Sequence, residues 1–224
     1  MKFKVGFGLV LISLTLVMLN YLSISLAQVS QTNLLYEDNF STSKNSLFSI
    51  YSDANSSAYF KDGKYRMTAT PPNGWASYYS GNKSSDIVME VEATQVSGPN
   101  DNAYGVGFRD DWINSYVFLI SGDGYYHYDK LMNDAWLPIR YQKWKPIIWN
   151  KSSAIHTGNS TNLIRVSCKG DEFSFYINDI KVDTFRDIDN SIPSGGIGLI
   201  AAAGGSLGDV TIDFDNLRIW ENSE

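Results

Sequence analysis

The chain has 224 residues, of which 18 are basic and 24 acidic, for a formal net charge of −6. An acidic surface argues against nucleic acid and anionic lipid as partners, because both are bound through cationic surfaces. The single cysteine, Cys168, excludes an internal disulfide. We expect Cys168 to be a small buried residue of a strand.

Residues 1–27 are typical of a secretory signal peptide. Lys2 and Lys4 precede an apolar run over 5–22, and small residues follow at 25–27. The alternative is an uncleaved anchor, because about 18 apolar residues just span a bilayer. Cleavage predicts a chain of 197 residues without a transmembrane segment, located outside the cytoplasm as a secreted or cell-envelope protein.

A short linker over 28–33 is expected to lead into one domain over 34–221, in which strand and turn patterns alternate. Apolar residues recur with a period of two, which is typical of strands with one buried face. The predicted strands, in chain order, are 34–40, 58–61, 64–70, 75–80, 86–96, 103–109, 115–121, 125–131, 161–169, 173–177, 180–182 and 210–219. Hairpin turns are predicted at Asp62-Gly63, Asp123-Gly124, Gly170-Asp171 and Asn178-Asp179.

The last predicted strand changes phase between Phe214 and Leu217, which indicates a bulge at Asp215-Asn216. About eleven or twelve antiparallel strands without a repeat indicate an all-β fold of two packed sheets, a jelly-roll β-sandwich.

Three motifs carry a resemblance to a known family. The pattern N-x-x-R-V-x-x-x-G-x-x-x-x-x-Y-I-N runs from Asn162 to Asn178, S-G-G-I-G-L covers 194–199, and F-D-N-L covers 214–217. Together with D-N-F at 38–40, they resemble the concanavalin A-like lectin/glucanase superfamily, in particular laminin-G-like and 3-keto-disaccharide hydrolase-like domains. The resemblance spans roughly residues 34–220. It implies a jelly roll that holds carbohydrate on its concave sheet or rim.

Two carboxylates are the weak candidates for catalysis. Glu90 and Glu92 share one face of a predicted strand, and glycoside hydrolysis requires two carboxylates beside the scissile bond. The glucanases of the resembling superfamily carry E-x-D-x-E or E-x-D-x-x-E, whereas the run from Glu90 to Gln95 lacks the third acid. The alternative interpretation is a solvated strand face.

Aromatic residues indicate carbohydrate binding, because flat rings match the C–H faces of sugars. The chain has 14 Tyr and 6 Trp. The predicted ligand surface combines rings with polar side chains that fix orientation. Its members are Tyr126, Tyr128, Trp136, Trp144, Trp149, Glu92, Arg109 and Arg165. For the rings the alternative is core packing, and for Glu92 and the two arginines it is outward ion pairs.

No organic cofactor is expected, and calcium is the one metal considered. Hard cations bind several oxygen ligands, and Asp38, Asp213 and Asp215 would meet if the first and last strands pair. Capping of turns and bulges is the alternative role for these residues.

The leading hypothesis is an exported, non-catalytic, lectin-like module whose partner is a polysaccharide or other glycan. A glycan-active hydrolase or lyase using Glu90 or Glu92 is the first alternative. An envelope adhesion or structural module with a protein partner is the second.

Overall fold

The computed structural model describes most of the predicted domain. The described residues are 33–71, 75–79, 85–133, 135–137, 149–189, 191–203 and 208–223, with the backbone alone for 75–79 and 135–137. The predicted signal peptide, the predicted linker and Trp144 lie outside these residues. Across the described ranges, no helix is long and apolar enough to cross a membrane.

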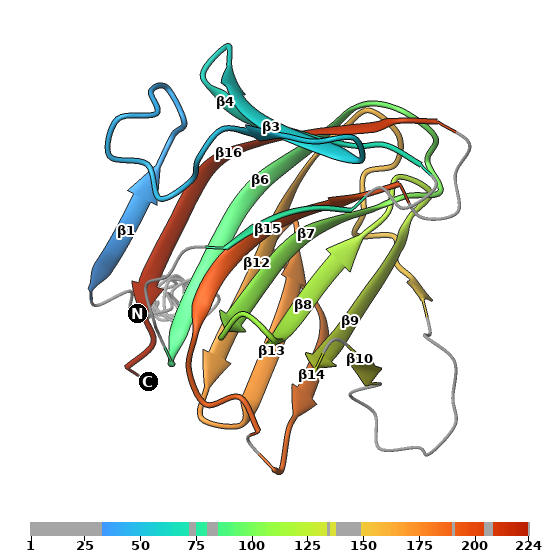
Figure 1. Ribbon diagram of the computed structural model, residues 1–224. Coiled ribbons are helices and arrows are strands. Elements are labelled where there is room, and N and C mark those ends of the chain that lie inside the picture. The colour runs from blue at the N-terminus through green and yellow to red at the C-terminus, as the bar shows by residue number, and fades with distance from the viewer. Residues whose placement is uncertain are drawn as a thin grey trace, which may run out of the picture. The chain divides into compact units, whose positions relative to one another are not determined.

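Strands in these ranges form two antiparallel sheets (Figure 1). The nine-stranded sheet contains β1 (Leu34–Asp38), β2 (Tyr51–Ser52), β3 (Ser56–Lys61), β4 (Lys64–Ala69), β6 (Ile87–Ser97), β12 (Thr161–Lys169), β13 (Glu172–Ile177), β14 (Ile180–Arg186) and β16 (Val210–Glu221). Its order is β14-β13-β12-β6-β16-β4-β3-β2, with β1 beside β16. This architecture confirms the predicted two-sheet fold.

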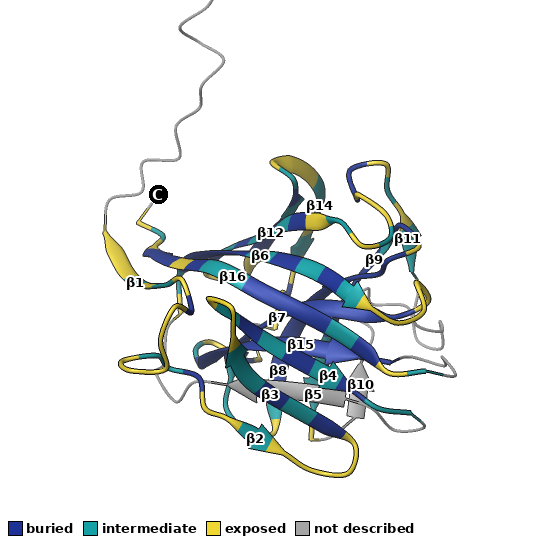
Figure 2. Cartoon of the chain, turned by 90° about the horizontal axis from the view of Figure 1, so that it is seen from above, coloured by how far each residue is buried: buried dark blue, intermediate teal, exposed yellow. Residues whose placement is uncertain are grey.

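The seven-stranded sheet contains β5 (Trp75–Tyr79), β7 (Ala103–Asp110), β8 (Asn114–Ile120), β9 (Tyr125–Met132), β10 (Ala135–Leu137), β11 (Asn150–Lys151) and β15 (Gly196–Ala202). Its order is β10-β9-β8-β7-β15-β5, with β11 beside β9. Figure 2 shows the two layers from above, with many of their strand residues buried.

Local sequence sets the hairpins. Asp62 and Gly63 have φ angles of 52° and 76°, and Asn178 and Asp179 have 50° and 65°. Two successive positive φ angles give the tight turn whose twist matches that of paired strands. The predicted bulge in β16 is also confirmed, because the register against β6 shifts between Asp215 and Arg218.

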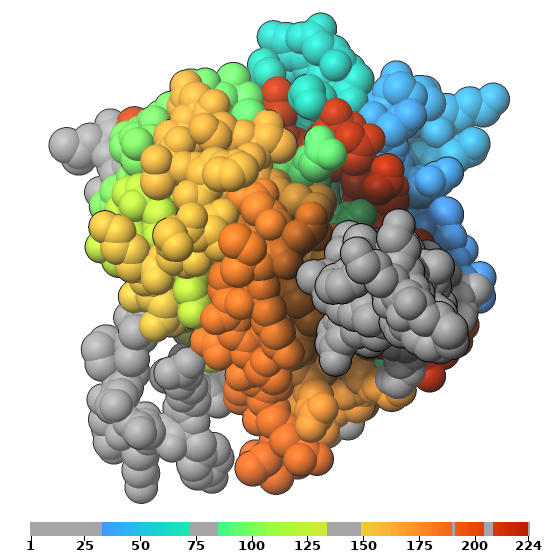
Figure 3. All heavy atoms as spheres, turned by 180° about the vertical axis from the view of Figure 1, so that it is seen from behind, coloured from blue at the N-terminus to red at the C-terminus, as the bar shows by residue number. Residues whose placement is uncertain are grey.

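The core lies between the sheets, where inward residues from both layers meet. Phe175 of β13 is fully buried, and its ring centroid lies 4.7 Å from that of Phe118 and 4.6 Å from that of Tyr128. Aromatic rings at such distances add to the stability that burial of apolar area provides. Seen from behind, the edge strand β14 lies at the surface (Figure 3) and carries Lys181 and Arg186, charges that oppose pairing with another chain.

Cys168 lies in this core, with no exposed surface, as the sequence predicted. Burial raises the pKa of its thiol to about 12. Because the thiolate is the reactive form, we expect no labelling by a thiol reagent at about pH 8 until the chain unfolds. Mass spectrometry after labelling with and without guanidinium measures this, and rapid labelling of the folded chain would contradict the placement.

Candidate functional site

The outer face of the seven-stranded sheet carries an apolar floor that is separate from the core between the sheets. Its buried members are Ala103, Val117, Leu119, Ile200 and Ala202. Ile200 of β15, Gly105 of β7 and Leu119 of β8 lie opposite one another in register. Gly105 has no room for a side chain, because a Cβ there would lie 2.2 Å from the Phe118 carbonyl oxygen. The floor is therefore smooth at its centre.

Polar and aromatic side chains border this floor along β9. Tyr125, His127 and Asp129 alternate onto the outer face, since Tyr126 and Tyr128 between them face the core. The strand β11 pairs with the start of β9 and brings Trp149 beside His127, with ring centroids 5.3 Å apart. We call Tyr125, His127, Asp129 and Trp149 the β9 cluster.

Two buried polar atoms on this face have no hydrogen-bond partner. Among the described residues, neither Asp129 Oδ2 nor Ser115 Oγ takes part in a hydrogen bond. Asp129 is 0% exposed and Ser115 is 1% exposed. His127 Nε2 lies 3.3 Å from Asp129 Oδ2, an ion-pair distance without hydrogen-bond geometry. Ser115 pairs with Leu131 and Asp129 with Val117, so the two residues are diagonal neighbours.

An unpartnered buried polar atom costs about 1–3 kcal/mol. Asp129 Oδ2 can accept a hydrogen bond and Ser115 Oγ can donate or accept one, so both match a hydroxyl-bearing molecule once the side chains that cover them move aside. Ser115, His127 and Asp129 are not among the site residues predicted from the sequence. The signal was the alternation of the polar residues His127 and Asp129 with Tyr126 and Tyr128.

Arg109, a member of the predicted ligand surface, does not lie on the outer face. A bulge between β7 and β15 and a φ of 52° turn its side chain into the interior, where the residue is 1% exposed. Its Nε donates to the Ser85 carbonyl at 2.9 Å, and its guanidinium lies 5.0 Å from the centroid of the Phe173 ring. Arg109 therefore supports the core rather than a ligand.

Tyr126 and Tyr128 also belong to the core. The prediction placed them correctly on one face of the strand, but that face points inward and the residues are 7% and 8% exposed. Their hydroxyls lie 3.4 and 3.1 Å from Asp183 Oδ2. The two rings therefore pack in the core, which was the alternative to ligand binding.

Glu90, Glu92 and Arg165 lie on the nine-stranded sheet, not on the sheet that carries the β9 cluster. Glu90 is 6% exposed and bonds to Arg165 at 2.8 Å and Arg218 at 3.4 Å. Arg165 also pairs with Asp179 at 2.7 Å. These contacts bear out the alternative of outward ion pairs for Arg165. Glu92 and Arg165 lie on the nine-stranded sheet, whereas Trp149 directly precedes β11 of the seven-stranded sheet.

Of the other predicted rings, Trp149 alone has a described side chain. Trp136 is placed only by its backbone, which pairs with Leu131, and Trp144 lies outside the described residues. Trp149 is half-buried against the apolar floor. It stays a predicted ligand residue.

The proposed calcium ligands do not converge. The strands β1 and β16 pair as expected, but Asp213 forms two hydrogen bonds with Arg66, and Asp215 pairs with Lys64 at 2.9 Å. Asp38 accepts hydrogen bonds from the Tyr36 hydroxyl and the Phe40 amide. Among the described residues no group of three or more histidine, cysteine or carboxylate side chains is arranged to hold a metal. In this structure these aspartates form ion pairs and cap the backbone, and calcium binding stays a prediction.

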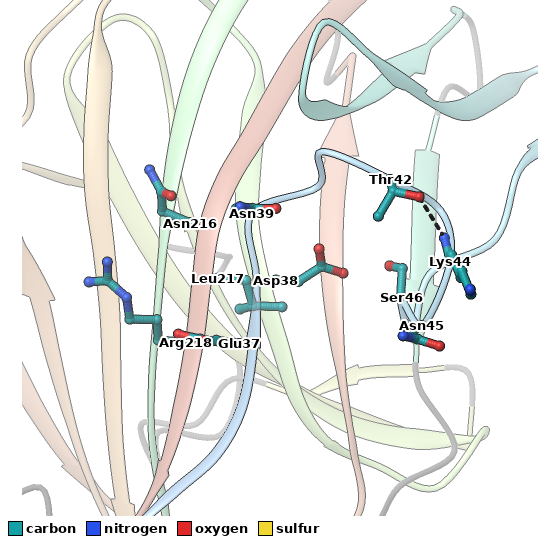
Figure 4. A pocket seen from close by; sticks show the side chains of 10 residues that line it. All are labelled: Glu37, Asp38, Asn39, Thr42, Lys44, Asn45, Ser46, Asn216, Leu217 and Arg218. Atoms are coloured by element: carbon teal, nitrogen blue, oxygen red, sulfur yellow. Dashed lines mark hydrogen bonds between the residues drawn. The ribbon is translucent and has the colours of Figure 1, made fainter.

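A cavity of about 380 Å³ lies where β1, β16 and the segment 39–46 meet. Figure 4 shows the carboxylate of Asp38 pointing from β1 across the cavity toward Ser46, while Arg218 on β16 points the other way. This cavity is on the nine-stranded sheet and is distinct from the β9 cluster.

No protein-family model and no curated protein sequence matches the chain. Solved structures do match. The carbohydrate binding module CBM66 from Bacillus subtilis is 22% identical, over 69% of this chain and 86% of that chain, with a TM-score of 0.54. A Bacillus subtilis protein of unknown function with a galectin-like fold is 9% identical, over 84% and 96%, with a TM-score of 0.62.

A Bacillus licheniformis β-glucanase is 12% identical, over 83% of this chain and 97% of that chain, with a TM-score of 0.59. At these identities the likeness concerns the fold. The two-sheet jelly roll is thus shared by proteins described as a binding module and as a glucanase.

Proposed function

Because the chain has the concanavalin A-like jelly-roll fold, we propose that it binds carbohydrate at the β9 cluster and does not cleave it. One observation carries the proposal: Asp129 Oδ2 and Ser115 Oγ are buried without a hydrogen-bond partner on the face where Trp149 packs against His127. Rings beside unpartnered hydrogen-bonding atoms match the surface of a sugar, which has apolar C–H faces and a hydroxyl edge.

The arrangement supports binding rather than hydrolysis. Glycoside hydrolysis requires two carboxylates across the scissile bond. Within the β9 cluster, Asp129 is the single carboxylate. Glu90, the alternative acid, is held between two arginines on the other sheet.

The test incubates the chain without residues 1–27 with immobilised neutral polysaccharides, including β-1,3-glucan and β-1,3-1,4-glucan, and also assays for reducing ends. We expect saturable binding to at least one polysaccharide that Asp129→Asn and Ser115→Ala weaken. No release of reducing ends is expected. Release that Asp129→Asn abolishes would replace the proposal with a hydrolase. Absence of binding to every polysaccharide would refute it.

We further propose that the chain acts after export, which the signal-like start of the sequence supports. The N-terminus of the mature chain in its producing cell is expected at Gln28. A mass spectrum that shows retention of residues 1–27 would favour the anchor instead.

A further inference from the structure

We propose that the cavity at β1 and β16 is a second ligand site, which takes a small neutral polyhydroxylated molecule such as a terminal sugar residue. Its volume of about 380 Å³ lies within the range of about 300–1,000 Å³ that is usual for small-molecule sites. It belongs to the nine-stranded sheet, whereas the β9 cluster belongs to the other sheet. An experiment can therefore refute one of the two proposed sites without refuting the other.

The walls of the cavity are preformed. On one side, the bulge of β16 places Asn216 at a φ of 50°, and on the other Asn45 has a φ of 70°. The segment 42–47, which contains Asn45, is held by two hydrogen bonds. Thr42 Oγ1 accepts from the Lys44 amide, and the Tyr36 hydroxyl accepts from the Leu47 amide. A ligand would thus bind without first ordering the segment.

The polar lining is available to a ligand. Within the described part of the chain, the carboxylate of Glu37 and the side-chain amides of Asn45 and Asn216 form no hydrogen bond. Each amide offers both donors and an acceptor, and Glu37 offers acceptors. A ligand can therefore form hydrogen bonds here without breaking any that the protein already has.

The charges at the cavity select the class of ligand. Two acidic residues, Glu37 and Asp38, and two basic residues, Lys44 and Arg218, line the cavity. Lys44 and Arg218 would repel a cation, and Glu37 and Asp38 would repel an anion. A neutral molecule avoids both penalties, and hydroxyl groups can pair with amides and carboxylates alike.

The experiment is an NMR titration of the isotope-labelled chain without residues 1–27, using methyl glycosides of common hexoses. Sodium acetate, calcium chloride and glycine serve as the anionic, cationic and zwitterionic probes. We expect saturable shifts at Asn45 and Asn216 with at least one glycoside, little changed between about 0.05 and 0.5 M salt.

Asn216→Gly tests the assignment, because glycine tolerates the φ of 50° while the amide is removed. We expect it to weaken the glycoside about tenfold, through the loss of one or two hydrogen bonds. The matched control is Asn133→Gly, at the same φ of 50° in the turn after β9, with no expected effect. Unchanged affinity in Asn216→Gly, tighter binding of a charged probe, or no shift with any glycoside would overturn the inference. Asp129→Asn should leave these shifts intact, which separates them from the proposed carbohydrate site.

Discussion

Arg109→Ala is expected to lower the free energy of unfolding by about 3 kcal/mol. The substitution leaves the carbonyls of Ser85 and Ile192 without the donors that reach them at 2.9 and 3.3 Å. It also opens a cavity beside Phe173, over whose ring the guanidinium lies. Because the residue is 1% exposed, water does not readily replace these contacts.

Arg165→Ala is the matched control. Its side chain is 22% exposed, and it pairs with Glu90 and with Asp179, which is 70% exposed. Ion pairs that water reaches contribute about 1 kcal/mol or less, so we expect a smaller loss. Urea unfolding followed by circular dichroism gives both values. Equal losses would contradict the interior placement of Arg109.

Trp149→Ala is expected to weaken polysaccharide binding about tenfold, because it removes the ring that packs against His127 and the apolar floor. The free energy of unfolding should change less than in Arg109→Ala, since Trp149 is only partly buried and lies beside the short strand β11. Isothermal titration with whichever polysaccharide binds the unaltered chain measures the effect.

Trp112→Ala controls for the loss of a tryptophan. Trp112 is 76% exposed in the turn between β7 and β8, at the end of β8 that pairs with Met132. His127, against which Trp149 packs, lies toward the other end of β8, where it pairs with Leu119. We expect near-normal affinity in this variant. If Trp112→Ala weakens binding and Trp149→Ala does not, the binding surface lies at the turn between β7 and β8 instead.

The fold could be predicted from the sequence because its signals are local. Alternation in 161–177 and the turn at Gly170-Asp171 identify a hairpin without knowledge of the rest of the chain. The phase change at Asp215-Asn216 identifies a bulge in the same way. Such patterns depend on neighbours within a few residues, which a single sequence contains.

The site could be predicted only in part, because its placement depends on residues far apart in the chain. Alternation groups Tyr126 with Tyr128 but does not say which face of β9 meets the other sheet. Glu90 faces Arg165 and Arg218 because β6 pairs with both β12 and β16. The side chain of Arg109 does not follow the alternation of β7, since the bulge beside it reverses the direction of that side chain.

The most direct test of carbohydrate binding at the β9 cluster uses the only two histidines of the chain. His127 lies in the cluster at 7% exposure, and His156 is exposed outside it, with its Nδ1 3.1 Å from the Thr161 carbonyl oxygen. In the chain labelled at histidine carbons, addition of a bound polysaccharide or its oligosaccharide should shift the imidazole resonances of His127 and leave those of His156 in place. Saturable binding that leaves His127 unmoved would contradict the account.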